Sequence, residues 1–163
     1  NVCSISPKEN NVINIIPESK ELGYVGTPKK INKERILNFI NNKQIPIVVP
    51  LGLGDDGRIY NINADVAAGS IAKEIDARRL LLMTDVEGVL DENQKLISEI
   101  NLNKANEMLK NNIISGGMIP KINTCLDAIS NGVRGVVIVD GRKPHSILFE
   151  LFSDKGAGTL IRK

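Results

Sequence analysis

The sequence predicts an α/β fold with a largely parallel β-sheet. Three short runs of branched apolar residues are typical of buried strands, at residues 45–50, 79–84 and 135–140. Segments with helical spacing lie between these runs. Strands that alternate with helices favour a parallel sheet covered by helices. The length of 163 residues fits one domain.

The composition is that of an ordinary globular domain. Apolar residues make up 42% of the chain and charged residues 25%, and the net charge is +2. That balance gives no reason to expect nucleic acid or a membrane as a partner, and no apolar run approaches the roughly 20 residues of a membrane span. Cys3 and Cys125 form neither a disulfide framework nor a zinc site. We therefore expect a reducing location, cytoplasmic or in a plastid.

The first third of the chain predicts short elements around one capped helix. Residues 12–16 read as a strand that ends at Pro17, and residues 23–26 as a short extended piece. Asn32 is placed to cap a helix over residues 33–40. A glycine-rich loop is expected at residues 52–57, then a short strand at 58–60 and a helix over 66–77.

The remaining elements follow the same alternation. Residues 88–97 predict a small excursion that turns around residues 91–94. Further helices are expected at residues 103–112, 117–131 and 146–152, with a terminal strand at 159–161. A parallel sheet binds ligands at the carboxyl ends of its strands. Candidate ligand segments are therefore residues 52–57, 84–88 and 140–145.

Residues 52–57 match the spacing G-x-G-x-x-G of dinucleotide-binding loops. That loop must open a helix, so that pyrophosphate sits at the helix N-terminus. Here a strand is expected to follow, and Asp55 and Asp56 would repel pyrophosphate. A glycine-rich turn is the favoured interpretation, and a nicotinamide-dependent oxidoreductase remains a weak alternative.

Asn61, Asn63 and Asp65 come directly before a helix of small residues. In a strand, this alternation puts all three side chains on one side, where they would form a ligand platform. The structural alternative is helix capping by Asn63 or Asp65, which explains one residue but not three.

Two further segments combine polar residues with glycine. Thr84 and Asp85 end a predicted strand, where Asp85 could contact a ribose or only initiate a turn. Gly116 and Gly117 precede a helix whose first turn holds Lys121, and glycine lets a ligand approach the backbone closely. A solvated surface lysine is the plain alternative for Lys121. No cluster of His or Cys accompanies the single histidine, so no metal site is predicted.

Four motifs together resemble the acetylglutamate kinases of the amino acid kinase family. They are YNINAD at residues 60–65, LMTDVEGVL at 82–90, ISGGMIPK at 114–121 and VDGRKPH at 139–145. The resemblance runs from about Gly23 to the C-terminus. It implies a three-layer αβα fold and one partial kinase domain over residues 1–163, mainly its nucleotide-binding half. The N-terminal portion of the family's domain has no counterpart here, so the chain is expected to be incomplete alone.

The resemblance implies phosphoryl transfer from ATP, with Mg²⁺, to the side-chain carboxylate of N-acetyl-L-glutamate in arginine biosynthesis. Lys121 and Asp65 match catalytic positions, and Asn61 and Asn63 match substrate-binding positions. The implied ATP-binding residues are Thr84, Asp85, Val86, Gly88, Leu90, Ile114, Ser115, Gly116, Gly117 and Met118. The chemistry suits these residue types, because a carboxylate nucleophile is already ionised and needs no general base. The site then has to position the two substrates and stabilise the charge of the transferring phosphoryl group.

The C-terminal segment resembles the arginine-inhibited branch of the family. His145, Glu150 and Gly158 are its implied arginine-binding residues, and L-arginine is an expected further ligand. A homo-oligomer is expected for the intact protein. Two alternatives stay open: a related kinase that acts on aspartate, glutamate or carbamate, and an inactive fragment that binds nucleotide or arginine without turnover.

Overall fold

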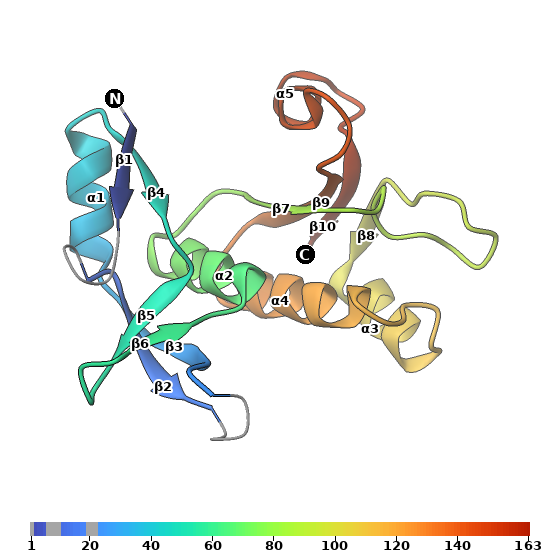
Figure 1. Ribbon diagram of the computed structural model, residues 1–163. Coiled ribbons are helices and arrows are strands. Elements are labelled where there is room, and N and C mark those ends of the chain that lie inside the picture. Colours follow the sequence, from blue (N-terminus) through green and yellow to red (C-terminus); the bar gives the residue numbers. More distant parts are fainter. Residues whose placement is uncertain (1, 6–10, 19–22) are drawn as a thin grey trace. The chain divides into compact units, whose positions relative to one another are not determined.

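The computed structural model describes residues 2–5, 11–18 and 23–163 (Figure 1), with side chains for residues 11–18 and 23–163. The chain divides into two compact units, Asn1–Ile75 and Asp76–Lys163. Each unit is described by itself. In the described residues, no helix has the length and apolar character to cross a membrane.

Unit 1 is built on a four-stranded sheet with the order β3-β2-β5-β6, beside a parallel pair of strands, β1 and β4. Among the described residues of unit 1, two helices complete it. The elements are β1 (Val2–Ile5), β2 (Ile13–Pro17), β3 (Gly26–Ile31), α1 (Lys33–Asn41), β4 (Ile45–Val48), β5 (Leu51–Gly54), β6 (Ile59–Asn61) and α2 (Ala64–Glu74).

The core of unit 1 is rich in isoleucine. Ile13, Ile15, Ile36 and Ile62 are almost fully buried in one cluster with Tyr60. The helix α1 begins where predicted, because the side-chain oxygen of Asn32 accepts a hydrogen bond from the backbone N–H of Arg35 at 3.1 Å. This contact satisfies one of the N–H groups that a helix start leaves unpaired.

The prediction of a buried strand at residues 45–50 is wrong in its burial. The strand β4 forms, but Ile45 and Ile47 are 65% and 54% exposed. They alternate with the half-buried Pro46 and Val48, and α1 contacts β4. Because side chains alternate between the two faces of a strand, one face of β4 is covered and the other is open.

The predicted loop at residues 52–57 is also corrected. Gly52 and Gly54 belong to β5, which pairs antiparallel with β6, and the turn is confined to residues 55–57. A Cβ atom on Gly52 would overlap the side chain of Ile15. The glycine therefore allows close packing between strands. No helix follows this segment directly, so the geometry disagrees with a dinucleotide-binding loop.

Unit 2 is built on the sheet β7-β9-β10-β8. In Figure 1, α3 and α4 lie together below this sheet and α5 lies above it, so unit 2 has three layers. The elements are β7 (Leu80–Thr84), β8 (Glu99–Asn101), α3 (Leu102–Lys110), α4 (Met118–Ser130), β9 (Gly135–Asp140), α5 (Ser146–Phe152) and β10 (Gly158–Arg162).

The α/β prediction is confirmed, and β9 is the centre of unit 2. All six of its residues are buried, with β7 parallel on one side and β10 antiparallel on the other. Near the start of β10, a Cβ atom on Gly158 would overlap the carbonyl oxygen of Ile138. The two backbones therefore approach each other at a distance that only glycine allows.

Candidate functional site

The carboxyl ends of β7 and β9 meet at one edge of the unit 2 sheet. Thr84 pairs with Asp140, and the backbone N–H of Gly141 donates to the carbonyl oxygen of Thr84 at 2.8 Å. Two of the three predicted ligand segments, residues 84–88 and 140–145, are thereby brought together. The third, residues 52–57, lies in unit 1 as strand and turn.

A pocket of about 240 Å³ opens beside this edge. We call it the α4 pocket, because its wall ends at the start of α4. Its lining residues are Val86, Gly88, Val89, Leu90, Gln94, Ile113, Ile114, Ser115 and Met118. Six of the ten residues implied to bind ATP are among them. A concave, mainly apolar lining with a few polar groups is typical of small-molecule sites.

Two chain segments form most of the α4 pocket, and Gln94 adds to its lining. Residues 86–90 leave β7, and Gly88 adopts φ +147° beside the buried Val89. Residues 113–118 connect α3 to α4, and the N–H of Ile113 donates to the carbonyl oxygen of Met108 at 3.0 Å. Ile114 is buried and holds this connection against the core. Val89 belongs to the motif at residues 82–90, whereas Gln94 and Ile113 lie outside the four motifs, because their role depends on contact between distant segments.

Four residues implied to bind ATP lie beside the α4 pocket lining without belonging to it. Thr84 and Asp85 form the end of β7, where the Thr84 hydroxyl donates to the Asp85 carboxylate at 3.2 Å. Gly116 and Gly117 lead into α4, and a Cβ atom on either would meet open space. Gly117 is the N-cap of α4 and provides no side-chain hydrogen bond to the helix start. The space beside these two glycines is therefore open, while the N–H groups of Met118 and Ile119 donate to the carbonyl oxygens of Ser115 and Gly116 at 3.3 and 3.2 Å.

Ionic contacts organise the neighbouring segment, residues 140–145. The buried carboxylate of Asp140 accepts hydrogen bonds from the backbone N–H, Nε and Nη2 of Arg142, at 2.9 to 3.0 Å. These hydrogen bonds lower the pKa of Asp140 from 3.8 to about 2. Lys143 forms an ion pair with Glu87 at 2.6 Å, which links this segment to the one that follows β7.

The residues implied to act on the acceptor substrate lie in unit 1, with Lys121 in unit 2. Asn61 ends β6, and Asn63 caps α2 by accepting from the N–H groups of Asp65 and Val66 at 3.0 and 3.2 Å. The capping alternative thus holds for Asn63. Since β6 ends at Asn61, strand alternation does not extend to Asp65, which lies in α2. Lys121 is half-buried in the first turn of α4, as predicted. The catalytic roles of Asp65 and Lys121 stay predictions.

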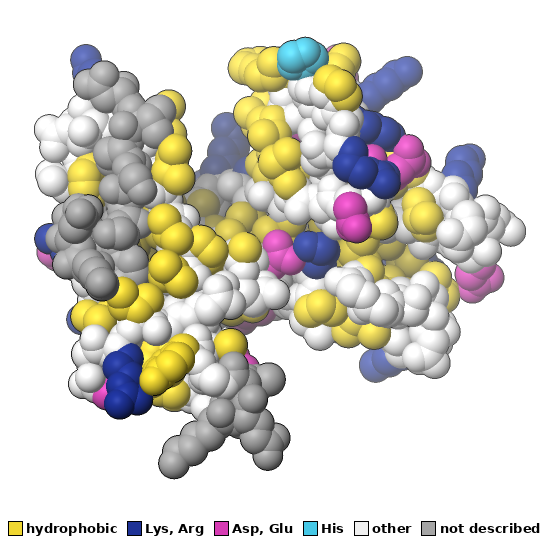
Figure 2. Space-filling model, viewed as in Figure 1, with side chains coloured by type: hydrophobic (Ala, Val, Ile, Leu, Met, Phe, Trp, Pro, Cys, Tyr) yellow, Lys and Arg dark blue, Asp and Glu magenta, His cyan; other side chains and the backbone are white. Residues whose placement is uncertain are grey.

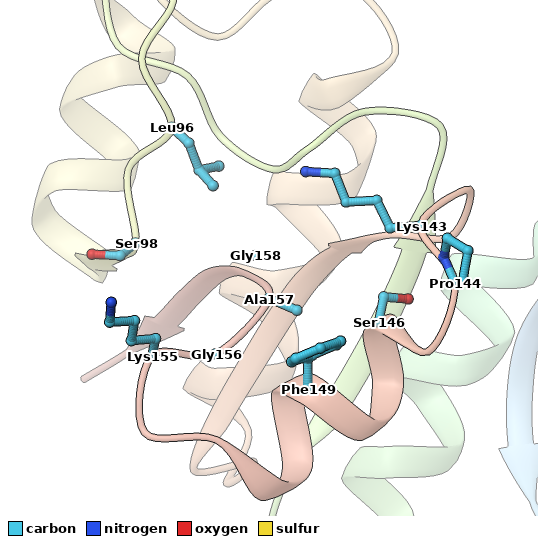
Figure 3. Close-up of a pocket in the computed structure, with 10 residues that line it drawn as sticks. All are labelled: Leu96, Ser98, Lys143, Pro144, Ser146, Phe149, Lys155, Gly156, Ala157 and Gly158. Atoms are coloured by element: carbon cyan, nitrogen blue, oxygen red, sulfur yellow. The ribbon is translucent and has the colours of Figure 1, made fainter.

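A larger pocket, of about 460 Å³, lies between α5 and the segment 96–98. We call it the α5 pocket. In Figure 3, Lys143 and Pro144 lie across it from Ser98 and Lys155, with Ala157 between them. A smaller pocket of about 230 Å³, the Glu150 pocket, shares Ser98, Lys155, Gly156 and Gly158 with it.

The residues implied to bind arginine take different positions around these two pockets. Gly158 lines both, and Glu150 lines the Glu150 pocket. Glu150 is buried, and its carboxylate already accepts from Arg79 at 3.2 Å and from the N–H of Ala157 at 2.9 Å. The guanidinium that Glu150 contacts in this structure is therefore that of Arg79, not that of a bound arginine. His145 is exposed in a left-handed conformation before α5 and lines neither of these pockets. Among the described residues, no group of three or more His, Cys, Asp or Glu could hold a metal ion.

Comparison with known proteins gives a consistent result. The model of the amino acid kinase family matches residues 1–140, so the resemblance begins earlier than the predicted Gly23. The acetylglutamate kinase of Pelagibacter ubique is 59% identical over 98% of this chain and 55% of its own length. The chain spans about half the length of the curated relatives it matches.

Solved structures match the fold over 99% of this chain. The crystal structure of smu.665 from Streptococcus mutans superposes with a TM-score of 0.82 at 33% identity and is covered over 60% of its length. The N-acetylglutamate synthase of Neisseria gonorrhoeae superposes with a TM-score of 0.89 at 24% identity and is covered over 38%. At that identity the second likeness concerns the fold alone.

Proposed function

Because this chain belongs to the amino acid kinase family, we propose that the protein containing it transfers the γ-phosphoryl group of ATP to the side-chain carboxylate of N-acetyl-L-glutamate. One observation carries the proposal. Six of the ten residues implied to bind ATP line the α4 pocket, in a chain 59% identical to an acetylglutamate kinase. The product is an acyl phosphate, which belongs to arginine biosynthesis. The chain forms part of one kinase domain, mainly its nucleotide-binding half.

ATP is proposed to place its base in the α4 pocket and its phosphates at the start of α4. The apolar residues of the pocket suit a flat base. Gly116 and Gly117 leave open space at the helix start, and no side chain caps it. The N–H groups and dipole of a helix N-terminus favour phosphate. Thr84 and Asp85 lie at the adjoining strand end, within reach of the ribose or phosphates in this arrangement.

Lys121 is proposed to stabilise the negative charge that develops on the transferring phosphoryl group. Its place in the first turn of α4 supports this role, because the same turn would receive the phosphates. Asp65 is proposed to hold the catalytic lysine geometry, and Asn61 to bind acetylglutamate. The side-chain oxygen of Asn63 already caps α2. Asn63 would therefore contact substrate through its amide NH₂ or its backbone.

The acceptor carboxylate needs no base to become a nucleophile, since it is ionised at neutral pH. Its oxygen forms the new bond to phosphorus as the bond to the ADP oxygen breaks, and ADP leaves with that electron pair. Mg²⁺ would be held mainly by the phosphates of ATP, because this ion keeps several waters and needs few protein ligands. When bound, it supplies charge neutralisation on those phosphates.

The test measures acyl phosphate, trapped with hydroxylamine, in the whole protein that carries this chain. Acetylglutamate is compared with aspartate, glutamate and carbamate as acceptors. Lys121→Ala should lower the rate by about 10²–10³, because it removes one charge-stabilising donor. Lys110→Ala, at the end of α3, is the matched control and should leave the rate unchanged. Turnover of another acceptor alone would support the alternative kinase, and ATP binding without turnover would support the inactive fragment.

L-Arginine is proposed as a further ligand of the α5 and Glu150 pockets. These two pockets share Gly158, and Glu150 lies in the second, as implied for arginine-inhibited relatives. Since Glu150 already pairs with Arg79, a bound arginine would have to share or displace that contact. His145 would take part only from the rim.

A homo-oligomer is proposed for the whole protein. Hydrophobic side chains gather over α5 in Figure 2, where Ile147, Leu148, Phe149, Leu151 and Phe152 are 40–83% exposed. An exposed apolar patch of this kind is typical of an interaction surface.

A cytoplasmic location, with a plastid as the alternative, stays a prediction.

A further inference from the structure

One wall of the α4 pocket comes from a hairpin over residues 88–98. Its two arms pair through an antiparallel bridge between Leu90 and Leu96, and the N–H of Ile97 donates to the carbonyl oxygen of Val89 at 2.9 Å. The tip closes on Asp91, whose carboxylate accepts from the N–H groups of Asn93 and Lys95. We call residues 88–90 and 96–98 the hairpin stem.

The side chain of Thr159, in β10, ties both arms of the stem to the sheet. Its hydroxyl accepts from the N–H of Val89 at 2.8 Å and donates to the carbonyl oxygen of Ile97 at 2.6 Å. Thr159 is fully buried, and Val89 is 1% exposed. Leaving buried backbone groups without partners is unfavourable, so this hydroxyl does more than fill space. The N–H of Leu160 adds a hydrogen bond to the carbonyl oxygen of Ser98 at 2.9 Å.

The Thr159 hydroxyl lies directly behind the pocket wall. Val89 is flanked by Gly88 and Leu90, and all three line the α4 pocket. A Cβ atom on Gly88 would lie 2.6 Å from the Thr159 hydroxyl oxygen. Thr159 is not among the lining residues, so any effect it has on a ligand acts through the wall.

We propose that Thr159 is a positioning residue for nucleotide: its hydroxyl fixes the hairpin stem so that Gly88–Leu90 forms a ready wall of the α4 pocket. The inference rests on the proposed function, because it takes ATP as the ligand of this pocket. Because the wall is fixed before binding, nucleotide does not have to order it, and the affinity is higher. A core threonine without this role would affect the stability of the fold but not the affinity for nucleotide.

The experiment compares three variants of the whole protein that carries this chain by calorimetric titration with Mg-ATP. Thr159→Val removes the hydroxyl and keeps the shape, and should weaken binding about fivefold, the effect of roughly one net hydrogen bond. Thr159→Ser keeps the hydroxyl and should bind within about twofold of the parent protein. Thr27→Val, at an exposed position of β3 in unit 1, is the matched control and should bind unchanged.

Amide hydrogen exchange at Val89 gives a second readout. Thr159→Val should exchange faster there and Thr159→Ser should not, because only the valine variant lacks the acceptor of this N–H. Mg-ATP should slow exchange at Val89 in the parent protein. If Thr159→Val does not fold, the proposal is tested by two other results. These are the slower exchange at Val89 on addition of Mg-ATP and the affinity of Thr159→Ser for Mg-ATP.

The inference is overturned if the valine variant binds Mg-ATP as tightly as the parent protein. It is also overturned if serine weakens binding as much as valine, since packing would then be the cause, or if Mg-ATP leaves Val89 exchange unchanged. A whole parent protein that binds no Mg-ATP would instead overturn the proposed ligand of the pocket, and the inference with it. The two failures are therefore told apart by the parent titration alone.

Discussion

Asp140 ends the central strand β9 with its carboxylate held by Arg142, and this contact makes the stability of the fold depend on pH. The hydrogen bonds from Arg142 lower the pKa of Asp140 to about 2 in the folded chain. A lowered pKa stabilises the fold above the unfolded value of 3.8, and this stabilisation is lost as pH falls toward about 2. We therefore expect Asp140→Asn to reduce the free energy of unfolding at neutral pH, with a difference that shrinks between about pH 4 and pH 2.

Urea unfolding across this pH range measures the effect. Asp154→Asn, at an exposed position after α5, is the matched control and should follow the parent chain at every pH. A difference between Asp140→Asn and the parent that stays constant with pH would contradict this assignment.

Whether a site residue could be predicted from the sequence depends on how far away in the chain its contact partners lie. Val86, Gly88 and Ile114 could be predicted, because each belongs to a short contiguous motif. Thr159 could not, since its partners Val89 and Ile97 are 70 and 62 residues away. Glu150 was predicted as a guanidinium ligand, but the sequence could not show that Arg79, 71 residues away, already occupies it.

At the scale of elements, the sequence predicted a helix start correctly where the capping residue lies next to the helix in the chain. The N-cap Asn32 predicts the start of α1 because cap and helix are adjacent. Asn32→Ala should lower the free energy of unfolding by about 1 kcal/mol, since it leaves the Arg35 N–H without its side-chain acceptor. Asn32→Ser retains an acceptor and should stay close to the parent chain. Chemical denaturation measures both, and equal losses in the two variants would contradict the capping role.

The strands that the sequence missed are short or lack alternation. The strand β3 holds Pro28, Lys29 and Lys30, which a sheet accepts at its edge, and β3 is an edge strand. The strand β5 looked like a loop because two of its four residues are glycine. The strand β8 has three residues and one buried side chain, Ile100, so no periodicity could reveal it. Long buried strands such as β9 were predicted within a residue.

At the scale of the whole molecule, ligands of the α5 and Glu150 pockets are expected to affect the proposed reaction. The stem residues Leu96 and Ser98 line the α5 pocket, while Gly88–Leu90 in the facing arm lines the α4 pocket. In the whole protein, L-arginine at millimolar concentration should lower phosphoryl transfer by about half or more. Citrulline, which lacks the guanidinium charge, should not, because a neutral group forms no ion pair. The phosphoryl-transfer assay measures both, and equal effects of the two compounds would contradict a guanidinium site.

The close approach of Gly158 to Ile138 also has a consequence for folding fidelity. In the native sheet Gly158 stands opposite Val139. If β10 slipped by one residue in either direction, Ala157 or Thr159 would take that place, and its Cβ would collide with the Ile138 carbonyl. A one-residue slip also sends every side chain to the wrong face. The absence of a Cβ atom at Gly158 thus allows β10 to pair with β9 in the native register and disfavours the two registers shifted by one residue.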